Sequence, residues 1–252
     1  GIAVYGCGVL AAAHVGGLRA LERHGLQYQN LRTLSGVSAG AVVVAMVAVG
    51  CEAEELFRLI QALPLVDLAK PHLGSVLRVA GNLLQDVLRK TLGDAAANAL
   101  EPLAGGHGPG LNTGRALEEM VGSALESKCG DAGITLGGVE RRFGRRLVII
   151  VCELDSGKEV HLTPETHPSL PVRVAVRMSM GVPGLMEPFK YDGHVYCDGG
   201  MCNDFPLNAV LGEEVRIGLM VRPVDWIEYH LGGVEGVLAR LGVGGPEGAE
   251  AP

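Results

Sequence analysis

The sequence of 252 residues predicts one α/β domain with three layers, in which a mainly parallel central sheet lies between helices. Short apolar runs alternate along the chain with longer segments in which apolar residues recur at helical spacing. Residues 147–152 are apolar throughout, which is typical of a strand that a parallel sheet buries on both faces. With 48% hydrophobic and 19% charged residues, the chain is long and apolar enough to bury one sizeable core.

The first fifty residues repeat a unit of strand, tight turn and helix. Each apolar run ends in glycines, and a glycine that can stop the helix follows each helical segment. The expected elements are a strand at 2–5, a helix at 11–24, a strand at 31–35, a tight turn at 36–40 and a helix at 41–49. Two such units in succession indicate an α/β fold.

Beyond residue 50, a long helical region precedes further strands. Residues 54–101 predict helices, and the amphipathic segment 75–92 could cover a site as a lid or lie on a lipid surface. Its lack of Trp and Phe favours packing on the body of the domain. The later elements expected are a helix from a cap at Asn112 or Thr113 to Leu125, a helical or mixed segment at 174–180, strands at 194–197 and 216–221, and a disordered tail at 243–252.

Composition and charge exclude several classes of protein. A net charge of -7 argues against a general nucleic-acid binder, because phosphate contacts need concentrated Lys and Arg. The longest apolar stretch, 39–49, is about half of the roughly 20 residues that a membrane-spanning helix needs. No signal peptide is visible, and since the first residue is Gly1 rather than Met, a leader or another domain could precede it.

The six cysteines show no CxxC pair, and some of them lie in apolar runs. This usage predicts free thiols in a reducing, intracellular compartment rather than a disulfide framework. The cysteines are Cys7, Cys51, Cys129, Cys152, Cys197 and Cys202.

The turn after the second strand, Gly36-Val37-Ser38-Ala39-Gly40, has the form G-x-S-x-G. Such a turn holds its serine on a strained corner, where flanking glycines remove the side chains that would collide. The Ser38 hydroxyl is then presented at the start of a helix, where N–H groups and the helix dipole favour a developing oxyanion. An ordinary glycine-rich turn is the alternative, but the strand before it and the apolar helix after it favour a nucleophile.

The first turn, Gly6-x-Gly8-x-x-Ala11, also fits the fingerprint of a dinucleotide-binding site. Such a site needs an acidic residue at the end of its second strand, where this chain has Ser35. The other use of a glycine turn at a helix start is to present bare N–H groups to an anion. We therefore expect the backbone from Gly6 through Cys7 to Gly8 to hold an oxyanion rather than a cofactor.

A nucleophilic serine needs a base, and Asp198 is the candidate. It follows a short strand and precedes Gly199 and Gly200, which is a position typical of functional loop residues. A simple turn aspartate is the alternative, because Asp-Gly is common in turns.

Together these motifs resemble those of the patatin-like phospholipases over roughly residues 1–210. The first turn with its following histidine is similar to that of the adiponutrin and adipose triglyceride lipase branch. The resemblance rests on Gly6-Cys7-Gly8, His14-Val15-Gly16, Gly36-Val37-Ser38-Ala39-Gly40, Pro183, Asp198-Gly199-Gly200 and Phe205-Pro206.

This resemblance implies a patatin-like lipid acyl hydrolase domain, which we expect at residues 1–242. It implies a dyad of Ser38 as nucleophile and Asp198 as base, with no histidine, metal or cofactor, and an acyl-enzyme on the serine. It also implies a lipid ester substrate, association with a membrane or lipid-droplet surface, and room for a protein activator. The implied oxyanion hole comprises Gly6, Cys7, Gly8 and Ala39, and the motif glycines are Gly36, Gly40, Gly199 and Gly200.

Two departures from the family pattern leave other functions open. Ala11 stands where the family has a glycine, and Leu10 stands where many members have a basic residue. A catalytically silent lipid-binding or interaction module is one alternative. Acyl transfer to an acceptor other than water, through the same serine, is another.

Two histidines have competing interpretations. His230 follows Asp198 in the chain order of an α/β-hydrolase triad, but a surface histidine is the default. His14 could orient the first turn or serve as a hydrogen-bonded packing residue.

Two further clusters have a structural alternative. The spacing of His194, Cys197 and Cys202 is faintly metal-like, but structural zinc needs four ligands, and strand and loop residues are favoured. The four arginines in residues 140–146 could bind anionic headgroups, or they could flank an aggregation-prone strand as charged gatekeepers.

Overall fold

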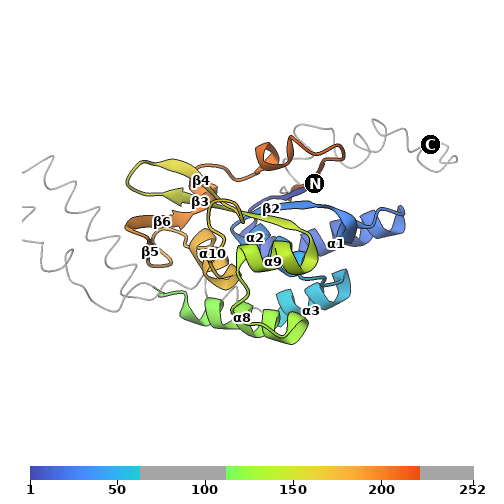
Figure 1. Ribbon diagram of the computed structural model, residues 1–252, viewed down its shortest axis with the longest axis horizontal. Coiled ribbons are helices and arrows are strands. Elements are labelled where there is room, and N and C mark those ends of the chain that lie inside the picture. The colour runs from blue at the N-terminus through green and yellow to red at the C-terminus, as the bar shows by residue number, and fades with distance from the viewer. Residues whose placement is uncertain (63–111, 222–252) are drawn as a thin grey trace, which may run out of the picture. The chain divides into compact units, whose positions relative to one another are not determined.

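The computed structural model describes residues 1–62 and 112–221 (Figure 1). The chain divides into two compact units, Gly1–Leu219 and Met220–Pro252, and the fold described here belongs to the first. It is an α/β fold with a central sheet and helices packed on it, as the sequence predicts. The helix expected at 75–92, His230, the domain boundary at 242 and the tail at 243–252 lie outside the described residues.

The described residues contain both strands and helices. The strands are β1 (Ile2–Val4), β2 (Thr33–Val37), β3 (Arg146–Glu153), β4 (Lys158–Leu162), β5 (Phe189–Tyr191), β6 (His194–Asp198) and β7 (Ile217–Leu219). The α-helices are α1 (Ala12–Arg23), α2 (Ala39–Ala48), α3 (Ala53–Ala62), α8 (Arg115–Cys129), α9 (Leu136–Phe143) and α10 (Val172–Ser179). The 3₁₀ helices are η1 (Gly8–Ala11), η2 (Tyr28–Asn30), η3 (Gly199–Met201) and η4 (Leu207–Val210). The second strand lies two residues further along than predicted, so Ser38 alone separates β2 from α2.

The sheet is mixed rather than mainly parallel. Strands β7, β1, β2 and β3 are neighbours in that order and run parallel. Strands β4 and β6 run antiparallel to β3, and β5 runs antiparallel to β6. The short connections explain the difference, because the turns from β3 to β4 and from β5 to β6 are too short for the crossover that a parallel pair requires.

The pairing on β3 brings two strand ends together. Val37, the last residue of β2, lies opposite Ile150, and Asp198, the last residue of β6, lies opposite Val151. Both β3 residues have their other partner in β4. Because β4 occupies one side of β3, β2 and β6 share the other side, and their carboxyl ends meet beside adjacent residues of β3.

Helix α2 lies at the centre of the hydrophobic core. All of its ten residues are buried, and all of them are Gly, Ala, Val or Met. It packs against β2, and Figure 1 shows α9 and α10 on the same side of the sheet, with α8 further out. The opposite face of β2 and β3 is apolar too, and Ala209 of η4 packs against it. None of the helices in the described ranges has the length and apolar character needed to cross a bilayer.

The expectation of free thiols is wrong for two cysteines. Cys152 and Cys202 form a disulfide, with Cα atoms 5.9 Å apart. They are 50 residues apart in the sequence, and the pairing of β6 with β3 brings the loop after Asp198 back to Cys152. These two cysteines therefore no longer support the prediction of a reducing compartment. The free cysteines of the described residues are Cys7, Cys51, Cys129 and Cys197.

Arginines of the 140–146 cluster are used within the fold. Arg145 donates to the carbonyl oxygen of Gln29 at 2.7 Å, which ties the start of β3 to the segment before β2. Arg146 forms an ion pair with Glu165 at 2.7 Å. These contacts favour a structural role for the two arginines over headgroup binding.

Candidate active site

Ser38 forms a strained corner between β2 and α2. Its φ is +52°, in the left-handed region that residues other than glycine rarely adopt. The neighbouring glycines are required, because a β-carbon at Gly36 would lie 2.5 Å from the Gly40 carbonyl oxygen. A β-carbon at Gly40 would in turn lie 2.5 Å from the carbonyl oxygen of Val4. The two glycines therefore let β1, β2 and α2 approach closely enough for the predicted turn.

The Ser38 hydroxyl donates a hydrogen bond to the Asp198 carboxylate, with Oγ and Oδ2 2.7 Å apart. The other carboxylate oxygen accepts from the Gly200 amide at 2.8 Å. The Asp198 amide itself donates to the carbonyl oxygen of Gly181 at 3.0 Å. The structure thus brings the two predicted catalytic residues together and holds the carboxylate where it can accept the serine proton.

Burial makes Asp198 a better base than a surface carboxylate. The residue is only 5% exposed. Loss of hydration raises the pKa of Asp198 to about 6, and repulsion from Asp204 adds to the rise, while the hydrogen bonds from Ser38 and Gly200 oppose it. A base is most effective when its pKa lies near the working pH.

Ser179, the last residue of α10, holds the backbone of Ser38. Its Oγ accepts a hydrogen bond from the Ser38 amide at 2.8 Å and donates one to the Ile150 carbonyl oxygen at 2.6 Å. The side chain is fully buried. None of the sequence motifs singles out Ser179. The signal that could have found it is a hydroxyl side chain one helical turn after Val176, which places it on the buried face of the helix.

His14 orients the first turn from within the core. Loss of hydration lowers the pKa of this buried side chain, which favours the neutral ring. Its Nε2 lies 2.9 Å from the carbonyl oxygen of Tyr5, which can only accept, so Nε2 carries the proton. The same atom lies 3.2 Å from Sγ of Cys7. The side chain therefore both packs in the core and fixes the turn.

The first turn offers amides to an anion, but not all of those expected. Gly8 has a φ of +52°, which favours glycine. Cys7 precedes η1, Gly8 begins it and Ala39 begins α2, so these N–H groups stand in first turns that leave them without helical acceptors. Gly6 differs, because its amide donates to the carbonyl oxygen of Asp204 at 3.1 Å. The expectation that Gly6 donates to an oxyanion is therefore corrected.

These features agree with one family of proteins. The model of the patatin-like phospholipase family matches residues 2–211, a span that includes Ser38 and Asp198. The chain belongs to the patatin-like phospholipase family.

Relatives of this family member are distant. The probable lipid hydrolase 463L of Invertebrate iridescent virus 6 is 24% identical over 194 residues, which are 77% of this chain and 58% of that protein. The protein R571 of Acanthamoeba polyphaga mimivirus is 23% identical over 206 residues, which are 82% of this chain and 59% of that protein. This chain thus spans less than two thirds of the length of either relative.

A solved structure supports the patatin-like fold. The crystal structure of VipD from Legionella pneumophila covers 90% of this chain with a TM-score of 0.56 and 17% identity. This chain covers 52% of VipD.

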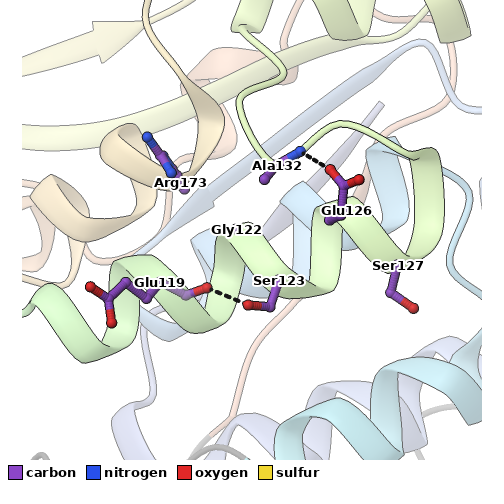
Figure 2. A pocket seen from close by; sticks show the side chains of 7 residues that line it. All are labelled: Glu119, Gly122, Ser123, Glu126, Ser127, Ala132 and Arg173. Carbon is purple, nitrogen blue, oxygen red and sulfur yellow. Dashed lines mark hydrogen bonds between the residues drawn. The ribbon is translucent and has the colours of Figure 1, made fainter.

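Figure 2 shows a pocket of about 530 Å³ that shares no residue with the site of this patatin-like domain. Its lining residues are Glu119, Gly122, Ser123, Glu126, Ser127, Ala132 and Arg173. Two of its polar groups already have partners, since Glu126 accepts from the Ala132 amide and Ser123 donates to a carbonyl of α8. The pocket is therefore not the candidate active site.

The faintly metal-like spacing does not correspond to a metal site. His194 pairs with Glu153 at 2.6 Å, Cys197 is buried, and Cys202 forms the disulfide. In the part of the chain that the structure describes, no group of three or more His, Cys, Asp and Glu side chains could hold a metal ion.

Proposed function

We propose that the protein is a metal-independent lipid acyl hydrolase of the phospholipase A or lipase type, with Ser38 as nucleophile and Asp198 as base. The observation that carries this proposal is the 2.7 Å hydrogen bond from the serine hydroxyl directly to a buried carboxylate. No histidine lies between the two groups, and the raised pKa of Asp198 suits a general base.

The geometry supports a two-step ester cleavage. As Oγ of Ser38 attacks the ester carbonyl, Asp198 takes its proton, and the amides of Cys7, Gly8 and Ala39 stabilise the oxyanion. The carbon–oxygen bond to the alcohol then breaks, Asp198 returns the proton to the leaving oxygen, and the acyl group stays on Ser38. Water then attacks this acyl-enzyme while Asp198 accepts its proton, the bond from the acyl carbon to Oγ of Ser38 breaks, Asp198 returns the proton to Oγ, and the fatty acid leaves.

We infer that the enzyme works at a membrane or lipid-droplet surface. Leu10 follows the first turn and is 52% exposed, and Met201 follows Gly200 and is 64% exposed. Val182, next to the residue that binds the Asp198 amide, is exposed as well. Apolar side chains exposed beside the site can contact acyl chains at such a surface.

The test is fatty-acid release from mixed lipid micelles in the presence of a metal chelator. The unmodified protein is compared with Ser38→Ala, Asp198→Asn and His230→Ala. Activity that survives chelation and His230→Ala, but is lost in the other two variants, supports the dyad.

Loss of activity in His230→Ala would instead indicate a triad. A folded protein that binds vesicles, releases no fatty acid and does not label with a fluorophosphonate would favour the silent lipid-binding module, which the departures from the family pattern at Leu10 and Ala11 motivate. Labelling of Ser38 without release would support a missing protein activator, and ester products formed with added alcohols would support acyl transfer.

A further inference from the structure

Asp204 is a second carboxylate beside the dyad, which none of the sequence motifs indicates. A β-carbon at Gly200 would lie 2.7 Å from Oδ1 of Asp204 and 3.1 Å from Oδ1 of Asp198. A β-carbon at Gly6 would lie 2.8 Å from the same Asp204 oxygen and 3.3 Å from Cβ of Ser38. The Asp204 carboxylate therefore lies between the loop that carries the base and the turn that precedes the oxyanion amides.

The backbone of Asp204 is fixed in this place. Its carbonyl oxygen accepts the Gly6 amide at 3.1 Å. The ring of the next residue, Phe205, packs edge-to-face on Tyr5 with ring centroids 6.1 Å apart, and its amide donates to the Asn203 side chain at 3.1 Å. The segment is thus held against the end of β1 on both sides of Asp204, which keeps the carboxylate near the site.

In the part of the chain that the structure describes, no cation pairs with the Asp204 carboxylate. Within the described residues, its carboxylate takes part in no ion pair and accepts no hydrogen bond. After burial, it is the charge that raises the pKa of Asp198 and that of Cys7, which reaches about 12. Among the causes of these two shifts there is no lysine or arginine. A solvent-exposed carboxylate therefore lies beside Gly6 and Gly200, on the side of the site where the dyad and the oxyanion turn meet.

We propose that Asp204 selects substrates by charge, so that the site prefers lipid esters with no anionic group beside the scissile ester, such as acylglycerols, over esters of a glycerol that carries a phosphate. This inference rests on the proposed hydrolase function of Ser38. Like charges about 6 Å apart in a partly hydrated site repel enough to change kcat/KM by a factor of about three to ten.

The test compares dibutyrylglycerol with dibutyryl phosphatidic acid. Both offer the same butyryl esters, and both can be used as monomers, so surface binding does not enter. Butyrate release at low ionic strength gives the ratio of the two kcat/KM values. We expect Asp204→Asn to lower the preference for the uncharged substrate about three- to tenfold, and about 1 M salt to lower it in the unmodified protein.

Glu214→Gln is the matched control. It removes one exposed carboxylate before the start of β7, whereas the site lies past the ends of the parallel strands, and we expect it to leave the ratio unchanged. Leu10→Lys places a cation on the exposed side chain just after the oxyanion turn, and we expect it to favour the phosphate-bearing substrate. The lysine variant keeps the inference testable should Asp204→Asn fail to fold.

Equal ratios in active unmodified protein and active Asp204→Asn would overturn the charge selection while leaving the hydrolase function intact. If neither ester is cleaved and Ser38 does not react with an uncharged fluorophosphonate, both proposals fall. If Ser38 reacts with the phosphonate but neither ester is turned over, the rates of labelling by an uncharged and an anionic phosphonate are compared instead of the two kcat/KM values. We then expect Asp204→Asn to lower the preference for the uncharged phosphonate.

Discussion

At the scale of single residues, Ser38 and Asp198 are each held in a state that the residue disfavours by itself. A positive φ at a residue other than glycine costs on the order of 1–3 kcal/mol. The buried carboxylate loses hydration, which its pKa of about 6 reflects. The hydrogen bond that the Ser38 amide donates to Ser179, and the one that Asp198 accepts from Gly200, hold both residues in place.

The first prediction concerns the dependence of activity on pH. Asp198 must be ionised to accept the serine proton, and its pKa is about 6. We expect kcat/KM to rise about tenfold per pH unit below 6 and to level off above it. Rates with an uncharged soluble ester, measured between pH 4.5 and 8, check this. A profile in which kcat/KM reaches half of its maximum near pH 4 would mean that the Asp198 carboxylate is solvated and would contradict the prediction.

The second prediction concerns stability. Because the folded pKa of Asp198 lies above its usual value of 3.8, the folded state holds the proton more tightly than the unfolded chain. The stability that this tighter binding of the proton by Asp198 contributes is therefore present below about pH 4 and is lost as the pH rises through 6. We expect Asp198→Asn to remove this loss, so that the variant is at least as stable as the unmodified protein at pH 7. Urea unfolding at pH 4.5 and 7 gives the comparison, and a variant less stable at pH 7 would contradict it.

The third prediction concerns Ser179. Removing its hydroxyl leaves the Ser38 amide without its acceptor and the Ile150 carbonyl without its donor. We expect Ser179→Ala to lower kcat about ten- to a hundredfold with little change in KM, because the nucleophile loses its orientation. Ser123→Ala, which removes an exposed hydroxyl on α8, is the control and should keep both constants. A change in KM alone would show that Ser179 acts on binding instead.

At the scale of elements, the site depends on a close approach of β1, β2 and α2. The β-carbon absent from Gly40 would collide with the backbone of Val4, and that absent from Gly199 would lie 2.3 Å from the Ile150 carbonyl oxygen. Backbone atoms cannot move aside as the end of a flexible side chain can. These motif glycines are therefore structural requirements of the turns on which Ser38 and Asp198 lie.

The fourth prediction compares two Gly→Ala substitutions. Gly40→Ala should destabilise the protein by several kcal/mol or abolish folding, because the new methyl group meets the Val4 carbonyl oxygen at 2.5 Å. Gly16→Ala, at an exposed position of α1 with no atom within 4 Å of the new carbon, should stabilise it by about 0.5–1 kcal/mol. Denaturant midpoints of the two variants decide the matter. Equal midpoints would contradict the prediction, because they would show that the turn around residue 40 adjusts to the new methyl group.

The proposed catalytic pair and the fold class follow from short patterns, since Ser38 and Asp198 each lie in a motif of five residues or fewer. Ser179, Asp204 and the Cys152–Cys202 disulfide do not. Their roles depend on which strands pair and in which register, and local sequence does not carry that information. The strand expected at 194–197 is β6, but its antiparallel direction was not predicted, and β4 and β5 were not expected, because β-strand patterns predict burial better than direction.

At the scale of the whole domain, β3 is the organising strand. It pairs with β4 on one side and with both β2 and β6 on the other, and its residues 147–151 are fully buried. By contrast, β7 pairs with β1 and is half-exposed. The most deeply buried part of the sheet thus lies where β2, which precedes Ser38, and β6, which ends at Asp198, meet on β3.

The fifth prediction follows from this distribution. Amides of β3 should exchange with solvent only through global unfolding, whereas those of β7 and β5 should exchange through local opening with a lower free energy. Hydrogen exchange followed by mass spectrometry, over a range of urea concentrations, separates the two classes. Similar protection in β7 and β3 would contradict the view that β3 is the most stable strand.

The meeting of β2 and β6 on one side of β3 has a consequence for biosynthesis. Ser38 lies in the first 62 residues of the chain, whereas Ser179 and Asp198 come from the later part. A nascent chain that has produced only its first strands and helices carries the serine without its base or its backbone support. If Asp198 is the base, as we propose, a chain in which β6 has not yet joined the sheet cannot hydrolyse lipid esters.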